Sequence, residues 1–248
     1  MLELNKIHNG DCLELMKDIP DKSIDMILCD LPYGTTKAIW DQIIPFEPLW
    51  NQYERIIKDN GAIILTASQP FTTTLITSNK KNYRYNLVWK KSRPSNPFLA
   101  NKQPLKYHED ICVFYKKQPT YNPIKTRGQK NHSSKGSHSK HELLDSNYEW
   151  KPNVSNEKYP SSIIEVKSTD STRNFHPTQK PVSLFEYLIK TYTNEGETVL
   201  DNCIGSGTTA IAALNTGRFF IGIEKEQEYV DIANERIRKA VNDRVVTV

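Results

Sequence analysis

The chain has 248 residues, of which 37% are hydrophobic, and a formal net charge of +4. This length is sufficient for one α/β domain that carries an insert, and the low hydrophobic content indicates that part of the chain is polar surface. No apolar run reaches the length of a membrane span, and the first residues lack a signal-peptide core, so we expect a cytoplasmic protein. The four cysteines form no CxxC pair, which favours reduced thiols over disulfides or a metal site.

Strand and helix patterns alternate in the first part of the chain. Residues 45–61 place apolar side chains on one helical face and predict a helix that ends at Gly61. Short apolar runs bounded by turn residues predict strands at residues 24–29, 62–68, 85–91 and 109–117. The last two strands are joined by a loop rich in Pro and Asn.

The periodicity disappears from about residue 116 to 175, a segment rich in Ser, Lys, Asn and Pro. Regular patterns return with a predicted helix at residues 180–196, which has Pro181 near its start. The rest of the chain predicts a strand at 198–201, a helix at 210–217, a strand at 219–224 and a helix at 226–241. Alternating strands and helices at both ends predict an α/β fold with a doubly wound, mostly parallel sheet, interrupted by an irregular insert.

The last strand–helix–strand unit has features of a nucleotide site. Gly205 and Gly207 lie between the strand and the helix, and Glu224 ends the next strand about twenty residues later, where it can accept ribose hydroxyls. Asp201 at the end of the first strand would repel a pyrophosphate but attract a cation. S-adenosylmethionine offers an ammonium and a sulfonium beside its adenosine. The alternative is a structural turn in which Asp201 is a cap.

A second motif, Asp-Leu-Pro-Tyr-Gly at residues 30–34, follows the predicted strand 24–29. Taken alone it reads as a tight turn. Together with the nucleotide unit, it resembles the β group of DNA amino-methyltransferases, whose signature is Asp-Pro-Pro-Tyr or a close variant. Leu31 departs from the commonest form. The order of motifs also matches, because HPTQKP at 176–181 and DNCIGSGTT at 201–209 come last, and the resemblance covers nearly the whole chain outside 116–175.

The resemblance implies a division of labour along the chain and a cofactor, S-adenosylmethionine. Residues 1–115 would form the catalytic half, 116–175 a target-recognition insert and 176–248 the cofactor-binding half. Lys180 would meet the carboxylate of the cofactor, and Asp11 would lie near its adenine ring unless it is only a helix cap. The implied cofactor pocket consists of Asp11, Asp30, His176, Lys180, Asp201, Gly205, Gly207, Thr208 and Glu224.

The implied catalytic residues are Asp30, Pro32 and Tyr33. The Asp30 carboxylate and a main-chain carbonyl near Leu31 or Pro32 would bind the two hydrogens of an exocyclic amine and leave its lone pair facing the methyl group. Tyr33 would stack on a base swung out of the duplex. In-line attack would follow, with Asp30 placed to take the excess proton.

Two basic stretches contain no Asp or Glu. Residues 78–108 carry eight Lys or Arg with several aromatic residues in or beside them, and residues 125–141 carry five Lys or Arg with three His. Each could be a solvated face, but clustered cations beside aromatic rings are typical of nucleic-acid binding. The DNA-binding candidates are Lys90, Lys91, Arg93, Lys102, Lys125, Arg127, Lys130, Lys135 and Lys140.

We therefore expect a prokaryotic or phage enzyme that methylates N6 of adenine in duplex DNA. An N4-cytosine enzyme is the alternative within the same chemistry, although those enzymes more often carry Ser where Asp30 stands, and RNA methylation is also compatible with the motifs. A nucleotide-binding dehydrogenase or a non-enzymatic nucleic-acid-binding protein is the more distant alternative, and Asp201 argues against it. A homodimer and a cognate restriction endonuclease are compatible with the resemblance. The motifs are shared by enzymes with different DNA sites, so they do not define the recognition sequence.

Overall fold

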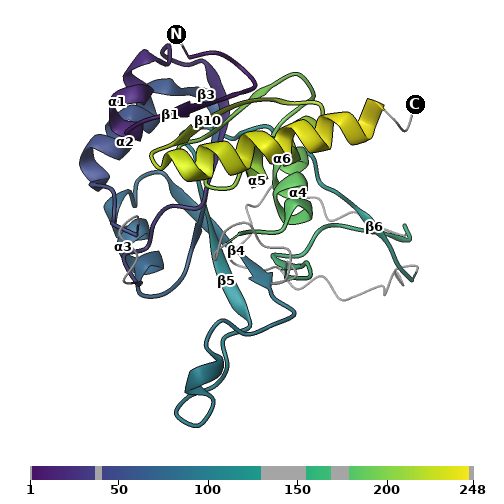
Figure 1. Ribbon diagram of the computed structural model, residues 1–248. Helices are drawn as coiled ribbons and strands as arrows, with labels where there is room; N and C mark the ends of the chain where they lie inside the picture. Colours follow the sequence, from purple (N-terminus) through teal and green to yellow (C-terminus); the bar gives the residue numbers. More distant parts are fainter. Residues whose placement is uncertain (1, 37–40, 130–154, 169–178, 246–248) are drawn as a thin grey trace. The chain divides into compact units, whose positions relative to one another are not determined.

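The computed structural model describes residues 2–36, 41–129, 155–168 and 179–245 (Figure 1). The chain divides into two compact units, one formed by residues 1–122 and 162–248 and the other by residues 123–161. The larger unit therefore also includes both ends of the segment in which the sequence shows no periodicity.

The larger unit is built on an eight-stranded sheet with the order β1-β10-β9-β2-β3-β5-β4-β8. All neighbouring strands pair in parallel except β5, which is antiparallel to both β3 and β4. The predicted doubly wound, mostly parallel sheet is thereby confirmed. In sheet order the strands are β1 (Lys6–Asn9), β10 (Phe219–Glu224), β9 (Thr198–Asp201), β2 (Ile24–Cys29), β3 (Ile57–Ala67), β5 (His108–Phe114), β4 (Tyr83–Lys90) and β8 (Ile163–Glu165).

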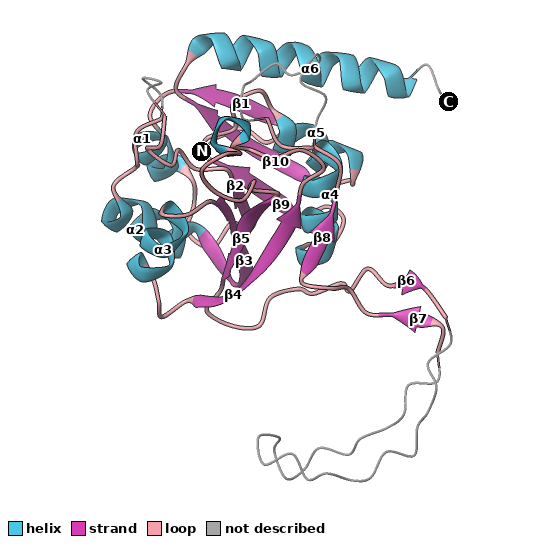
Figure 2. Ribbon diagram, turned by 90° about the horizontal axis from the view of Figure 1, so that it is seen from below, coloured by secondary structure: helices cyan, strands magenta, loops and turns pink. Residues whose placement is uncertain are grey.

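Helices cover both faces of this sheet (Figure 2). Because successive strand residues point to opposite faces, Met26 and Leu28 of β2 enter one core while Ile27 and Cys29 enter the other. The first core includes residues of α4 (Val182–Tyr192), α5 (Thr208–Asn215) and α6 (Gln227–Val245). The second includes residues of α1 (Cys12–Leu15), α2 (Phe46–Ile56), α3 (Phe71–Ser78) and the short 3-10 helix η1 (Met16–Asp18).

The boundary between α2 and β3 differs from the sequence prediction. The helix predicted to reach Gly61 ends at Ile56, and Ile57 already pairs with Ile24 of β2. The strand then bulges before Ala62 pairs with Met26. A Cβ atom on Gly61 would lie 2.8 Å from the carbonyl oxygen of Asp25, so this glycine permits close approach of two backbones and does not end a helix.

The smaller unit contains β6 (Thr126–Arg127), paired antiparallel with β7 (Glu157–Lys158). Lys125 Nζ lies 2.9 Å from Glu157 Oε2 and 5.0 Å from the centre of the Tyr159 ring.

Across the described part of the whole chain, no helix combines the length and apolarity needed to cross a membrane. All four cysteines are free thiols, and three of them are buried.

Candidate active site

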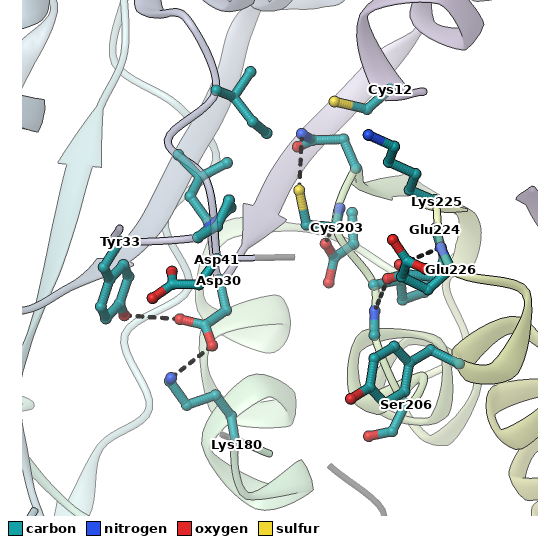
Figure 3. Close-up of a pocket in the computed structure, with 18 of the residues that line it drawn as sticks. Cys12, Asp30, Tyr33, Asp41, Lys180, Cys203, Ser206, Glu224, Lys225 and Glu226 are labelled. Carbon is teal, nitrogen blue, oxygen red and sulfur yellow. Dashed lines mark hydrogen bonds and ion pairs between the residues drawn. The ribbon is translucent and has the colours of Figure 1, made fainter. Parts of the chain in front are cut away.

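A cavity of about 660 Å³ lies at the carboxyl ends of β2, β9 and β10. Its size falls within the roughly 300–1,000 Å³ of typical small-molecule sites. Parallel strands present their carboxyl ends at the same edge of the sheet, where open α/β folds bind their ligands. The acidic residues that end or follow these three strands, Asp30, Asp201 and Glu224, all line the cavity. Figure 3 labels Asp30 and Glu224 on its two sides.

The Asp30 carboxylate is held by three donors. Its Oδ1 accepts hydrogen bonds from the Tyr33 hydroxyl at 2.7 Å and from the Thr66 hydroxyl, and its Oδ2 lies 2.6 Å from Lys180 Nζ. Figure 3 shows the Tyr33 and Lys180 side chains both directed at this carboxylate. An ionised carboxylate can accept about four hydrogen bonds. These three contacts therefore leave one acceptor position on Asp30.

Lys180 belongs to a buried chain of alternating charges. Its ammonium also lies 3.3 Å from Glu109 Oε2, and Glu109 Oε1 is 2.6 Å from Lys91 Nζ. Burial alone lowers the pKa of Lys180, but the Asp30 and Glu109 carboxylates raise it to about 12. Burial raises the pKa of Glu109, and the two lysines more than offset this and hold it below its usual value. Lys180 and Glu109 therefore remain charged near neutral pH, and Lys180 faces two protein carboxylates.

Asp41 closes the loop that follows the Asp30 motif. Its buried carboxylate accepts hydrogen bonds from three consecutive backbone N–H groups, those of Gly34 at 2.8 Å, Thr35 at 2.9 Å and Thr36 at 2.6 Å. Gly34 has φ +66°, which favours glycine, and a Cβ atom there would lie 2.9 Å from Ile43. The turn that carries Asp30 and Tyr33 is thus tied at its far end by one side chain.

Glu224 organises the glycine turn on the other side of the cavity. Its carboxylate accepts from the backbone N–H of Gly205 at 2.8 Å and of Glu226 at 3.0 Å. Gly207 has φ +84°, and a Cβ atom there would lie 2.9 Å from Ala233 of α6. Burial raises the pKa of Glu224 despite these hydrogen bonds. Each oxygen keeps a lone pair for a ligand hydroxyl.

Asp201 is more deeply buried, and its carboxylate is engaged within the same turn. It accepts from the Thr209 hydroxyl and from the Cys203 backbone N–H at 3.1 Å. Burial raises its pKa to about 7, although the hydrogen bonds act in the opposite direction. Asp201 therefore makes hydrogen bonds within the turn and lines the cavity, but it does not cap α5, whose N-cap is Gly207.

The remaining cofactor-site candidates are placed as follows. Asp11 is the N-cap of α1, accepts from Leu13 N at 2.9 Å and lines the cavity, so both of its predicted roles are compatible with its position. The Thr208 hydroxyl donates to the Lys180 carbonyl at 3.4 Å. Pro32 lines the cavity beside Asp30. His176 lies outside the described residues.

The DNA-binding candidates are spread over both units. Arg93, Lys102 and Arg127 are exposed, and Lys90 pairs with Glu165 at 2.9 Å on the surface. Lys91 is instead only 13% exposed and faces the cavity, so it is placed to act on the site and not on the outer surface. Lys125 pairs with Glu157. The other insert candidates, Lys130, Lys135 and Lys140, lie outside the described residues.

Three residues of the site were missed by the sequence analysis, namely Asp41, Thr66 and Glu109. Glu109 had a signal, because it is the first acid after Asp59 and stands at the start of a predicted strand. Thr66 carries no signal, because a Thr after the apolar run 62–65 is ordinary in a strand. Asp41 has none either, since it stands seven positions after Gly34 and no short-range pattern links the two.

The sheet and the cavity at its carboxyl ends define a Rossmann-like α/β fold, a class in which ligands bind at this edge of the sheet. The chain belongs to the N6/N4 methyltransferase family described as DNA methylase, whose family model matches residues 24–235. This family depends on S-adenosylmethionine.

Known relatives match over most of the chain. It is 28% identical to the type II methyltransferase M1.MboII of Moraxella bovis, over 94% of this chain and 96% of that protein. It is 31% identical to the type II methyltransferase M.BglII of Bacillus subtilis, over 93% of this chain and 68% of that protein. The solved complex of M1.HpyAVI with SAM is 26% identical, has a TM-score of 0.66 and covers 94% of this chain and 98% of its own. The cytosine-N4-specific PvuII methyltransferase, with 17% identity, a TM-score of 0.66 and coverage of 95% of this chain and 90% of its own, shares the fold.

Proposed function

We propose that this protein methylates N6 of adenine in duplex DNA, with S-adenosylmethionine as the methyl donor. The observation that carries this proposal is the single acceptor position left on Asp30 at the inner edge of the cavity. An exocyclic amine presents one hydrogen for such a position and a second for a main-chain carbonyl of the same turn. The choice of adenine rests on Asp30 itself, because related N4-cytosine enzymes more often carry Ser at this place.

The residues around the cavity fit the cofactor. Glu224 offers carboxylate lone pairs to the ribose hydroxyls, and Asp11 borders the same end of the cavity, where an adenine ring would lie. Asp201 contributes a carboxyl group toward the cationic part of the cofactor. When bound, S-adenosylmethionine supplies a methyl group activated by its sulfonium. Asp30 and Tyr33 line the same cavity, so a target base that enters it would lie beside them.

The protein's own groups would orient the amine. Three donors lock the Asp30 carboxylate in one rotamer, so it accepts the amine hydrogen without further ordering. Tyr33 would stack on the extruded base with a ring that already packs on Phe71, at a centroid distance of 5.0 Å. Asp30 is also the group placed to receive the proton that the amine loses.

We further propose that residues 116–175, with the basic loop between β4 and β5, select the DNA site. Their support is the acid-free basic composition of 78–108 and 125–141, which suits phosphate binding. Replacement of 125–141 by a neutral linker should abolish or relax DNA recognition and leave cofactor binding intact. Methylation of the same sites at the same rate by that variant would place recognition elsewhere. We also propose that the protein forms a homodimer, has a cognate restriction endonuclease and is located in the cytoplasm.

The test is the chemistry of the product. Genomic DNA incubated with the purified protein and S-adenosylmethionine is digested and examined by mass spectrometry, and sequencing of modified bases gives the site. N6-methyladenine is expected as the only new base, and Asp30→Ala should give none above background. N4-methylcytosine as the only new base would overturn the choice of adenine and establish the alternative within the family. Absence of any methylated base with bound cofactor would overturn the proposal.

A further inference from the structure

The connection between β4 and β5 ends in an exposed apolar tip. Residues 91–107 extend away from the sheet and carry the short 3-10 helix η2 (Pro97–Leu99) near their far end (Figure 1). The Phe98 side chain is 97% exposed, more than any other exposed large hydrophobic residue among those described, and Leu99 beside it is 37% exposed. A solitary exposed apolar residue needs no explanation, so the setting of this one decides whether it has a role.

The loop that carries Phe98 is held in shape by its own hydrogen bonds. At its stem, Lys91 N donates to Tyr107 O at 2.7 Å and Ser95 N donates to Lys106 O at 3.0 Å. Nearer the tip, Leu99 N donates to Asn96 O at 3.0 Å, and the Asn96 side chain accepts from Lys106 N at 2.6 Å. The tip is therefore a preorganised projection, for which presenting an aromatic ring costs little further conformational entropy on binding.

The stem of the loop stands at the rim of the cavity. Lys91 and Ser95 line the same cavity as Asp30. Lys106 donates a hydrogen bond to the hydroxyl of Ser68, which directly follows β3, the strand next to β2. The loop that carries Phe98 is thus anchored beside the cavity that Asp30 lines.

The charge around the tip fits DNA. No Asp or Glu occurs from residue 78 to residue 108, and the exposed Arg93 and Lys102 flank the tip without an ion pair to any residue in the described ranges. An aromatic side chain buries roughly 150–250 Å², whereas a stable protein interface buries about 800 Å² on each partner. One ring is too small for a dimer interface but matches the apolar wedges that proteins insert between base steps.

We propose that Phe98 is a wedge that enters the duplex at the target base pair and stacks on the bases that remain when the target base leaves. The inference rests on the proposed function, since it presumes that a base is extruded into the cavity beside Asp30. Extrusion costs pairing and stacking energy, and the inserted ring offsets part of that cost. Arg93 and Lys102 would hold the phosphates on either side of the opened step.

The test compares a paired target with one that is already open. Two duplexes carry the site found by sequencing. In the paired duplex, 2-aminopurine replaces the target adenine. In the abasic duplex, the position opposite the target lacks a base, so the target is already unpaired. Phe98→Ala should weaken binding to the paired duplex about 5- to 150-fold, as expected for loss of a stacking ring, and should reduce the 2-aminopurine signal of base opening. The abasic duplex should restore most of that loss, and Phe98→Trp should behave like wild type.

The controls separate a wedge from other roles. Phe219→Ala removes an exposed ring at the amino end of β10, the opposite edge of the sheet, and should change nothing. Calorimetry should give the same cofactor affinity for all variants. Wild-type binding by Phe98→Ala, an equal loss on both duplexes, or a change of oligomeric state in sedimentation would each overturn the wedge. Failure of the wild-type protein itself to methylate any duplex would instead overturn the proposed function.

Discussion

Replacement of Asp41 by Asn should impair catalysis although this residue lies at the far end of the turn from Asp30. The carboxylate accepts three backbone N–H groups, one on Oδ1 and two on Oδ2. An amide keeps only one acceptor oxygen. In its better orientation it retains the two bonds from Thr35 and Thr36 and sets its NH₂ group against the N–H of Gly34, so one bond is lost and one donor faces another.

The magnitude follows from that count. A hydrogen bond to a charged group contributes about 1.5–3 kcal/mol, and the two retained bonds become weaker because the acceptor is neutral. If the substitution destabilises the observed conformation of the turn by about 2 kcal/mol, kcat/KM should fall roughly 30-fold. Affinity for S-adenosylmethionine should change much less, because Glu224 and Asp201 lie on other strands.

The assay is kcat/KM for DNA methylation, with calorimetry for the cofactor. Asp59→Asn is the matched control, since Asp59 is an exposed carboxylate at the start of β3 that pairs with Lys22 and Lys117 away from the cavity. An Asp41→Asn enzyme with wild-type kcat/KM would refute the argument that one carboxylate ties the turn. Equal losses of cofactor affinity and kcat/KM would show that the residue supports the whole cavity.

The pH dependence provides a second check on Asp41. Burial alone would raise its pKa, but the Thr36 hydroxyl and the three N–H groups lower it below the ordinary value of 3.8. A depressed folded-state pKa gives stability that is complete above the unfolded-state pKa and is lost as the pH falls through the folded-state pKa. The difference in unfolding free energy between wild type and Asp41→Asn should stay constant from pH 5 to 8 and shrink below about pH 4.

Four further changes test the site. Asp30→Ala should leave cofactor affinity nearly intact and reduce turnover by roughly 10² or more in a single-turnover assay, and full activity would overturn the mechanism. Tyr33→Phe should lose severalfold in turnover because it removes the hydroxyl that donates to Asp30, whereas Tyr33→Ala should lose a further 1–3 kcal/mol or so of base stacking. Glu224→Ala and Asp201→Ala should each weaken S-adenosylmethionine binding in calorimetry, and unchanged affinity in both would contradict the assigned pocket. Because the folded-state pKa of Asp201 is raised to about 7, wild type should lose stability relative to Asp201→Asn as the pH rises from 4 to 7, which urea unfolding at several pH values would detect.

Local sequence determined the elements and their order. Five of the six residues of β2 are apolar and all six are buried, which is typical of an interior strand in a sheet covered on both sides. The apolar faces of α2 and α4 require a core to pack on. The glycine turn before α5 and the acid that ends β10 also follow from short-range pattern, since both depend on residues adjacent to one strand end. These features are set by burial and by backbone geometry over a few residues.

Tertiary structure alone decided which side chains meet Asp30. Lys180 lies 150 positions after it and Thr66 lies 36 positions after it, and no periodicity relates such distances to contact. The same holds for the antiparallel direction of β5, which brings Glu109 to the cavity, and for the end of α2 at Ile56, where pairing with β2 prevailed over helical pattern. Buried charges are stable only when their partners are in place, and those partners come together only when the sheet order has joined distant strands.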